Sequence, residues 1–192
     1  ETRQVVFVLG EGRNRAHALQ LIDAHVSPTQ AVAALEQVQA FLYREARLLD
    51  DRQWDEWLAC YHPAVDFWMP SWDDDDQLTT DPQREISLIF YANKGGLEDR
   101  VFRIKTERSA ASMPEPRTGH NIHNVEILSA KGEQIELRFN WHTLSYRYQT
   151  VDSYFGTSHY TLDLSSGQPL IKRKHVVLKN DYIHHVLDIY HI

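Results

Sequence analysis

Histidine is the residue type that first suggests chemistry in this chain, because its imidazole binds metal ions and transfers protons. The sequence contains 11 histidines. His120 and His123 are three residues apart, a spacing that turns them to opposite faces of a strand, and the adjacent His184 and His185 diverge for the same reason. No two histidines are spaced to share one side of a predicted helix. A metal site of two histidines and a carboxylate is therefore a weaker interpretation than hydrogen-bonded or surface histidines.

Four consecutive aspartates, Asp73–Asp76, form the most acidic segment of the chain. Calcium binds several carboxylate oxygens, but this run lacks the alternating spacing, central glycine and distal glutamate of the known calcium loop. Adjacent carboxylates repel one another and usually form a solvated loop. Two interpretations stay open, a solvated loop and a contact with a basic surface on another subunit.

Buried acid–base groups on the concave side of a curved sheet would suit an enzyme with a pocket. The candidates are Asp66, His142, His159 and Tyr154. Asp66 stands between two apolar residues, so strand alternation alone explains it as an outward-facing polar position. The sequence has no glycine-rich phosphate loop and no Gly-x-Ser-x-Gly motif. We therefore predict no catalytic, cofactor-binding or metal-binding residue in this chain.

The large aromatic residues are too numerous for one small core, so we expect most of them in the core and some at subunit contacts. They are Trp54, Trp57, Phe67, Trp68, Trp72, Phe139 and Trp141. Cys60 is the single cysteine and, beside Tyr61 in an apolar segment, is predicted to be buried rather than a nucleophile. One cysteine excludes an internal disulfide, a cysteine-rich zinc site and a cysteine-ligated iron–sulfur cluster held by this chain alone.

The composition is that of one domain with a substantial core. The 192 residues carry 20 Lys+Arg and 27 Asp+Glu, a net charge of −7, which argues against nucleic acid or an anionic membrane as a partner. No apolar run approaches the roughly 20 residues of a membrane span, and no cleavable signal is visible. We expect a cytoplasmic protein.

The elements that must position these residues begin with helices. Residues 1–26 read as an N-terminal arm with a short apolar run, and residues 27–192 as a single domain. Ser27 and Pro28 start a helix that runs to about Leu49, with apolar residues at three- and four-residue steps. A second, short helix carries Trp54 and Trp57. A third is predicted from Leu97 to Arg108, after Gly95 and Gly96 end a segment, 86–92, that is either strand or helix.

The second half of the chain alternates with the period of strands. A strand at 65–69 precedes the acidic run, and four more are predicted around 122–127, 135–141, 154–164 and 171–178. The apolar phase slips after Trp141 to Leu144 and Tyr146, which predicts a bulge near His142 or Thr143. Short connections predict an antiparallel meander. The tail, 182–192, is apolar enough to pack. Helices followed by strands indicate an α+β fold with a curved sheet wrapped around the helices.

Several longer strings are specific enough to suggest a family. FLYREARLLDDRQWDEWLACY (41–61), FWMPSWDDDD (67–76), EISLIFYANKGGLEDRVFRIKTERSAASMPEPRT (85–118), HNI (120–122), VEIL (125–128), RFNWHT (138–143) and VLKNDYI (177–183) carry the likeness. Over residues 26–192 the chain resembles the small, or β, subunit of bacterial aromatic-ring-hydroxylating (Rieske non-haem iron) dioxygenases. Within that family it is most similar to the benzoate, toluate and halobenzoate branch.

This resemblance implies a cone-shaped α+β fold with N-terminal helices packed into a strongly curved, mainly antiparallel sheet, as in scytalone dehydratase, ketosteroid isomerase and the nuclear transport factor. It implies a complex of three large and three small subunits. The Rieske [2Fe-2S] cluster and the mononuclear Fe(II) would belong to the large subunit, which would receive electrons from a reductase, and this chain would hold no cofactor.

The resemblance thus predicts a structural, non-catalytic subunit of an oxidoreductase that cis-dihydroxylates a benzoate-type acid with O2 and NADH-derived electrons. Contacts are expected from the Trp68–Trp72 loop, the acidic run and the termini. The alternative is a stand-alone, cofactor-free dehydratase or isomerase with a pocket inside the cone. A third, weaker interpretation is a plain ligand-binding domain. A scaffold should have a cone filled by side chains such as Trp141 and Tyr160, and a pocket enzyme an open cone lined by converging ionisable groups.

Overall fold

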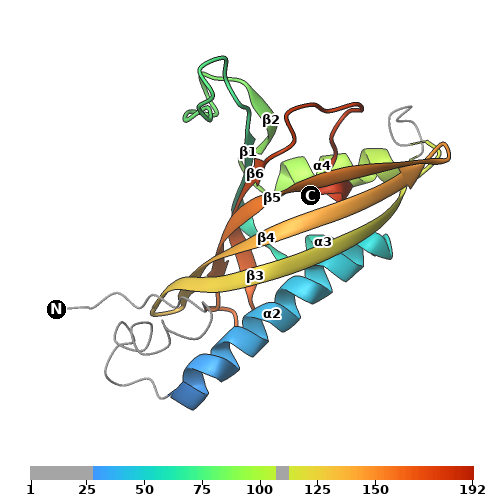
Figure 1. The fold of residues 1–192 in the computed structure, drawn as a ribbon. Helices are drawn as coiled ribbons and strands as arrows, with labels where there is room; N and C mark the ends of the chain where they lie inside the picture. Colours follow the sequence, from blue (N-terminus) through green and yellow to red (C-terminus); the bar gives the residue numbers. More distant parts are fainter. Residues whose placement is uncertain (1–27, 107–112) are drawn as a thin grey trace.

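One six-stranded sheet dominates the computed structural model, which describes residues 28–106 and 113–192. The strands lie in the order β2-β1-β6-β5-β4-β3 (Figure 1). Their bounds are β1 (Tyr61–Pro70), β2 (Ser87–Tyr91), β3 (Arg117–Lys131), β4 (Gln134–Arg147), β5 (Thr150–Asp163) and β6 (Leu170–Leu178). Neighbours are antiparallel except for β1 and β6, which are parallel. The predicted antiparallel meander is confirmed for β3 to β6.

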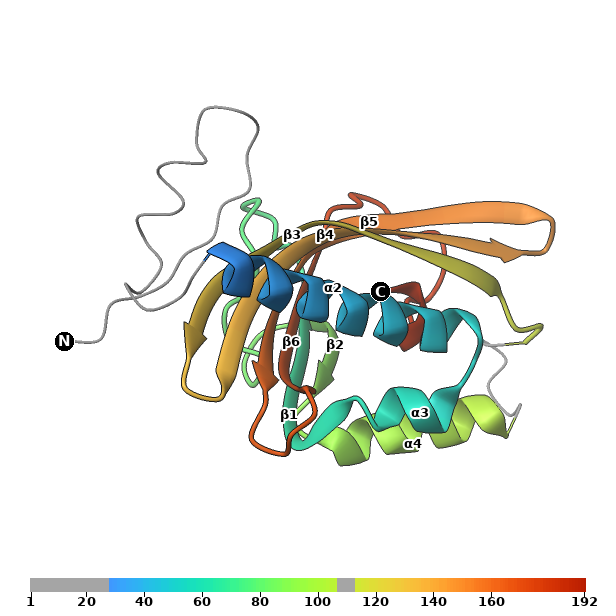
Figure 2. The ribbon, with the colours of Figure 1, turned by 90° about the horizontal axis from the view of Figure 1, so that it is seen from below.

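The helices lie inside the curve of the sheet. The long α2 (Pro28–Asp50) packs against β3, whereas α4 (Lys94–Lys105) packs against β1 and against the short α3 (Trp54–Leu58). Figure 2 shows the long strands arching over α2, with α3 and α4 across the interior from it. A 3-10 helix, η2 (Ile189–His191), lies at the open end. The predicted α+β class with a curled sheet around helices is confirmed. Of the helices described, none has the length and apolar content needed to span a bilayer.

The helix predictions hold with shifted ends. The apolar stripe of α2 is buried as expected, with Leu42 and Leu49 almost fully covered; its predicted cap, Ser27, and the predicted arm, 1–26, lie outside the described residues. The third helix begins at Lys94, earlier than predicted, because Asn93 caps its first turn by accepting a hydrogen bond from the Gly95 amide. The segment 86–92 is strand β2.

Gly96 lies inside α4 because the helix passes close to β2. A Cβ at this position would meet Tyr91 Cδ1 at 2.6 Å. The two glycines that were expected to end the preceding element therefore belong to the first turn of the helix. The small size of Gly96 allows α4 to approach β2.

The predicted bulge near His142 and Thr143 is wrong. β4 pairs with β5 without a break from Gln134 to Arg147. The apolar phase slips because the strand changes what it buries: Thr143 and Ser145 point inward, and Leu144 and Tyr146 are exposed on the outer face. The irregular pairing between β3 and β4 lies in β3 instead, between His123 and Glu126 and again between Ile127 and Ser129.

The core is filled by large side chains from both halves of the chain. Trp57, Phe67 and Leu137 have no exposed surface. Trp141 and Tyr160, the two residues expected to fill the cone of a scaffold subunit, are 4% and 3% exposed. Of the aromatic set, only Trp72 is strongly exposed, and its Nε1 donates to the Leu178 carbonyl oxygen at 2.7 Å. The prediction that most of these residues are core is confirmed.

Candidate functional site: the interior and mouth of the cone

Only one of the four candidate acid–base groups faces the interior. Tyr154 is 3% exposed and packs against the His191 ring, and burial raises its pKa to about 12. Asp66 lies on the outer face, as predicted, and its carboxylate is 3.9 Å from Arg173. His142, also outside, is 2.7 Å from the Ser153 hydroxyl. Strand alternation separates these groups, so they do not form one site.

His159 is part of a row of side chains that crosses the outer face of the sheet. Its ring centroid is 6.1 Å from that of His175, which stacks on Trp68 at 4.9 Å. Burial, reinforced by Arg138, lowers the pKa of His159, and burial with Arg173 lowers that of His175. Both imidazoles are therefore neutral at pH 7 and serve as a packed aromatic surface.

The interior holds a buried ion pair that the sequence analysis missed. Glu45 of α2 and Lys174 of β6 are 3% and 1% exposed, and Lys174 Nζ donates to Glu45 Oε1 at 3.2 Å. The same oxygen accepts from Trp57 Nε1 at 3.0 Å and from the Tyr61 hydroxyl at 2.8 Å. Burial lowers the pKa of Lys174, although Glu45 opposes this effect. The carboxylate thus links α2, α3, β1 and β6.

Two signals could have found this pair. Glu45 falls on the apolar stripe of α2 beside Leu42 and Leu49, and Lys174 has the same parity in its strand as Val176 and Leu178. Each signal alone marks a charged residue at an inward position. Only the fold, which brings together residues 129 apart, shows that they compensate each other.

A second, partly buried pair joins α2 to β3 near the open end. Asp50 lies 2.6 Å from His120 Nδ1 and accepts hydrogen bonds from the His120 amide and the Thr118 hydroxyl. Burial disfavours ionisation of Asp50, but the contacts with His120 outweigh it, and its pKa is lowered. The pair fixes the end of α2 on the sheet. His123, as predicted, points to the opposite, exposed face.

The C-terminal residues close the open end of the cone. Ile189, Tyr190, His191 and Ile192 are all buried. The predicted packing of the tail, 182–192, is thus confirmed for its end only, because Tyr182 and Val186 are 67% and 72% exposed. Asp188 caps this segment and forms an ion pair with Arg100 of α4, with Arg100 Nε 2.7 Å from Asp188 Oδ1.

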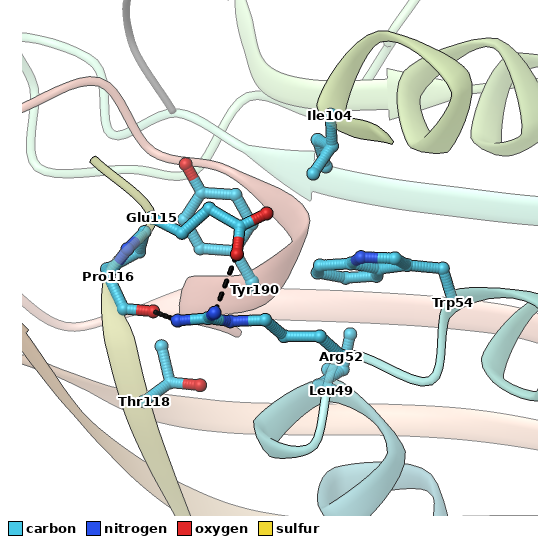
Figure 3. A pocket seen from close by; sticks show the side chains of 8 residues that line it. All are labelled: Leu49, Arg52, Trp54, Ile104, Glu115, Pro116, Thr118 and Tyr190. Carbon is cyan, nitrogen blue, oxygen red and sulfur yellow. Dashed lines mark hydrogen bonds and ion pairs between the residues drawn. The ribbon is translucent and has the colours of Figure 1, made fainter. Parts of the chain in front are cut away.

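The described residues leave a small cavity at the mouth of the cone, and a separate hollow of about 230 Å³ is lined by Tyr154, His191, Asp152 and His185 among others. The small cavity is the one beside Arg52. It is lined by Leu49, Arg52, Trp54, Ile104, Glu115, Pro116, Thr118 and Tyr190 (Figure 3). Its volume is about 10 Å³, which is room for about one water molecule, whereas ligand pockets typically measure roughly 300–1,000 Å³. Arg52 spans its rim, 2.6 Å from Glu115 and donating to the Pro116 carbonyl oxygen at 2.9 Å. Beside Arg52 the mouth is thus filled by the chain itself.

The other candidate residues, Cys60, the C-terminal histidines and the acidic run, do not form a site together. Cys60 is 2% exposed, and burial raises the pKa of its thiol to about 11, so it is a protonated core residue at neutral pH, as predicted. His184 and His185 lie in an irregular segment rather than a strand; His185 is 3.7 Å from Asp152. The acidic run is exposed. Within residues 28–106 and 113–192, no three His, Cys, Asp or Glu side chains are grouped to bind a metal ion.

Comparison with known proteins identifies the family. The model of the "Ring hydroxylating beta subunit" family matches residues 44–185. The chain is 63% identical over 159 residues to the benzoate 1,2-dioxygenase subunit beta of Acinetobacter baylyi, covering 83% of this chain and 94% of that protein.

Two solved structures show the same fold. The crystal structure of the benzoate 1,2-dioxygenase beta subunit from Burkholderia mallei matches with a TM-score of 0.69 and 56% identity, over 88% of this chain and 100% of the other. A putative scytalone dehydratase from Novosphingobium aromaticivorans matches with a TM-score of 0.58 at 13% identity, over 83% and 95% of the two chains, a likeness of fold alone. On the family match and the 63% identity, the chain belongs to the ring-hydroxylating beta subunit family.

Proposed function

We propose that this chain is the structural, non-catalytic small subunit of an oxygenase that cis-dihydroxylates a benzoate-type aromatic acid with O2 and NADH-derived electrons. The filled cone carries this proposal. The cavity beside Arg52 measures about 10 Å³, and Tyr154, which lines a hollow of about 230 Å³, is the one candidate acid–base group that faces inward. High identity to a benzoate 1,2-dioxygenase beta subunit supports the reaction class.

In this proposal residues 27–192 act as one domain, with residues 1–26 as an arm. The chain supplies no catalytic, cofactor-binding or metal-binding side chain. The Rieske cluster and the mononuclear iron reside in the large subunit, which receives electrons from a reductase. Three large and three small subunits assemble in the cytoplasm.

The outer face of the sheet supports a role in assembly. Leu144, Tyr146, Tyr148, Val151 and Phe155 gather around the β4–β5 turn, with exposures between 42% and 67%. A contiguous apolar patch of this kind is typical of a protein–protein contact. We assign this patch, together with the exposed Trp72 and the acidic run, to contacts within the complex.

Sedimentation of the small and large subunits, expressed separately and together, tests this proposal. We expect a single complex of three large and three small subunits on co-expression. The double substitution Tyr146→Ser/Phe155→Ser should weaken association of the small with the large subunit at least ten-fold. Serine at Phe102, which is 67% exposed on α4, serves as the matched control and should leave association unchanged. A monomer that does not bind the large subunit would contradict the proposal.

The stand-alone dehydratase or isomerase is disfavoured by the same geometry. Such an enzyme needs an open interior with two or more converging ionisable groups. Here the interior ion pair of Glu45 and Lys174 is enclosed by Trp57, Tyr61 and other core side chains. A substrate has no room beside it.

A further inference from the structure

The mouth of the cone combines apolar walls with one guanidinium group. Leu49, Trp54 and Ile104 form the walls and are 1%, 8% and 2% exposed. Arg52 reaches over them from the turn between α2 and α3 (Figure 3). An aromatic wall beside a guanidinium is a chemical match for a small aromatic carboxylate, since guanidinium binds planar carboxylates through paired hydrogen bonds and the ring packs on apolar side chains.

The backbone at Arg52 adds an independent observation. Its φ is 55°, in the left-handed region. The Arg52 amide donates to the Leu49 carbonyl oxygen and the Gln53 amide to that of Leu48, the pattern of a helix end at which glycine is the usual residue. Arg52 thus carries a side chain at a position where glycine would avoid the backbone strain. Strained non-glycine positions of this kind concentrate at ligand-binding sites.

Two groups of the chain already hold the positions that a ligand would take. The Glu115 carboxylate is 2.6 Å from Arg52 Nη1. The Tyr190 ring lies across the cavity from Trp54, with 6.4 Å between centroids. The Thr118 hydroxyl donates to Asp50, and Arg52 is the one cationic side chain among those that line this cavity.

We propose that the mouth of the cone is a binding site for a small aromatic carboxylate, which this chain fills with its own Glu115 carboxylate and Tyr190 ring. A ligand must displace both groups, because the space left is about 10 Å³. The unaltered chain therefore binds such acids weakly. The site does not depend on the assembly proposed above.

The test uses the full chain with Glu115→Gln and Tyr190→Ala together, and benzoate, benzene and acetate as probes. At a benzoate concentration ten times its dissociation constant, we expect the unfolding midpoint of the double variant to rise by about 3–6 °C. Benzene should also raise it, because a buried apolar hole of ring size binds benzene. Acetate should not, and the unaltered chain should shift by less than about 1 °C at the same benzoate concentration.

Adding Arg52→Leu to the double variant separates charge from cavity. Benzoate affinity measured by calorimetry should fall at least ten-fold, whereas the benzene shift should persist. A folded double variant that responds to neither ring compound overturns the proposal, as does benzoate affinity that is unchanged without Arg52. If the Glu115→Gln/Tyr190→Ala variant does not fold, Glu115→Gln alone is measured. Benzoate must then bind the Glu115→Gln variant more tightly than it binds the unaltered chain, and equal affinities overturn the proposal. Subunit sedimentation is a separate measurement, so failure of the site and failure of the assembly are distinguishable.

Discussion

Replacing Glu45 by glutamine keeps the shape of the side chain and removes the charge that compensates Lys174. The two groups are 3.2 Å apart and nearly inaccessible to solvent. At an effective dielectric constant of about 20, a pair at this distance attracts by about 5 kcal/mol. Breaking a buried pair by removing one partner typically costs about 3–5 kcal/mol, and we expect a loss of that size. Trp57 and Tyr61 can still donate to the amide oxygen.

Urea unfolding followed by tryptophan fluorescence measures this loss. With a slope of about 2 kcal/mol per molar urea, the midpoint should fall by about 2 M with the slope unchanged. The double variant Glu45→Gln/Lys174→Met should cost less than the two single losses added together, with a coupling of about 3 kcal/mol. Additive losses, or a loss below about 1 kcal/mol for Glu45→Gln, would refute the reasoning that the pair is compensated in a low-dielectric interior.

The pH dependence of the Glu45→Gln variant carries a definite sign. Burial already lowers the pKa of Lys174 in the folded chain, and removing Glu45 removes the group that chiefly opposes this shift. Between the lowered folded pKa and the ordinary unfolded value, the unfolded chain binds more protons than the folded chain. The stability of the variant should therefore rise with pH in this alkaline window.

Three further predictions concern the core and the C-terminal segment. Gly156→Ala should prevent stable folding, because the added Cβ would meet the Val177 carbonyl oxygen at 2.0 Å. The control Gly119→Ala, whose Cβ would have nothing within 4 Å, should change the free energy of unfolding by less than about 1 kcal/mol. Chemical denaturation measures both. Burial lowers the pKa of His191 to about 4 in the folded chain. The contribution of this group to the free energy of unfolding, about 2–3 kcal/mol, is therefore present above pH 6.5 and is lost as the pH falls toward 4. Chemical unfolding measured across that range should show a flatter pH dependence for His191→Gln. Cys60, with its pKa raised to about 11, should react with a thiol reagent at pH 7.5 at least 100-fold more slowly in the folded chain than in urea, and equal rates would contradict its burial.

Periodicity was sufficient to predict most of the secondary structure, because each helix and strand buries one face. It failed where that relation changes along an element. In β4 the inward side chains become polar at Thr143 and Ser145 while Leu144 and Tyr146 face outward, so an unbroken strand reads as a bulge. The apolar residues there lie on the outer face of the sheet rather than in the core.

The interior site was out of reach of the sequence for a different reason. Glu45 and Lys174 compensate each other across 129 residues, and Arg52 meets Glu115 only because the end of α2 lies beside the start of β3. Single-chain patterns identify such residues as charged, but their partners depend on tertiary packing. The outward positions of Asp66 and His142, by contrast, follow from strand alternation alone.

We propose that this chain shapes the oxygenase and takes no part in its chemistry. Tyr154, the inward-facing candidate acid–base group, allows the most direct test. Benzoate turnover per large subunit should be measured for complexes assembled with the unaltered chain and with Tyr154→Phe, at equal assembly by sedimentation. We expect rates within about two-fold of each other. A fall of 100-fold or more in a fully assembled complex, the order expected when a general acid–base group is lost, would contradict a purely structural role.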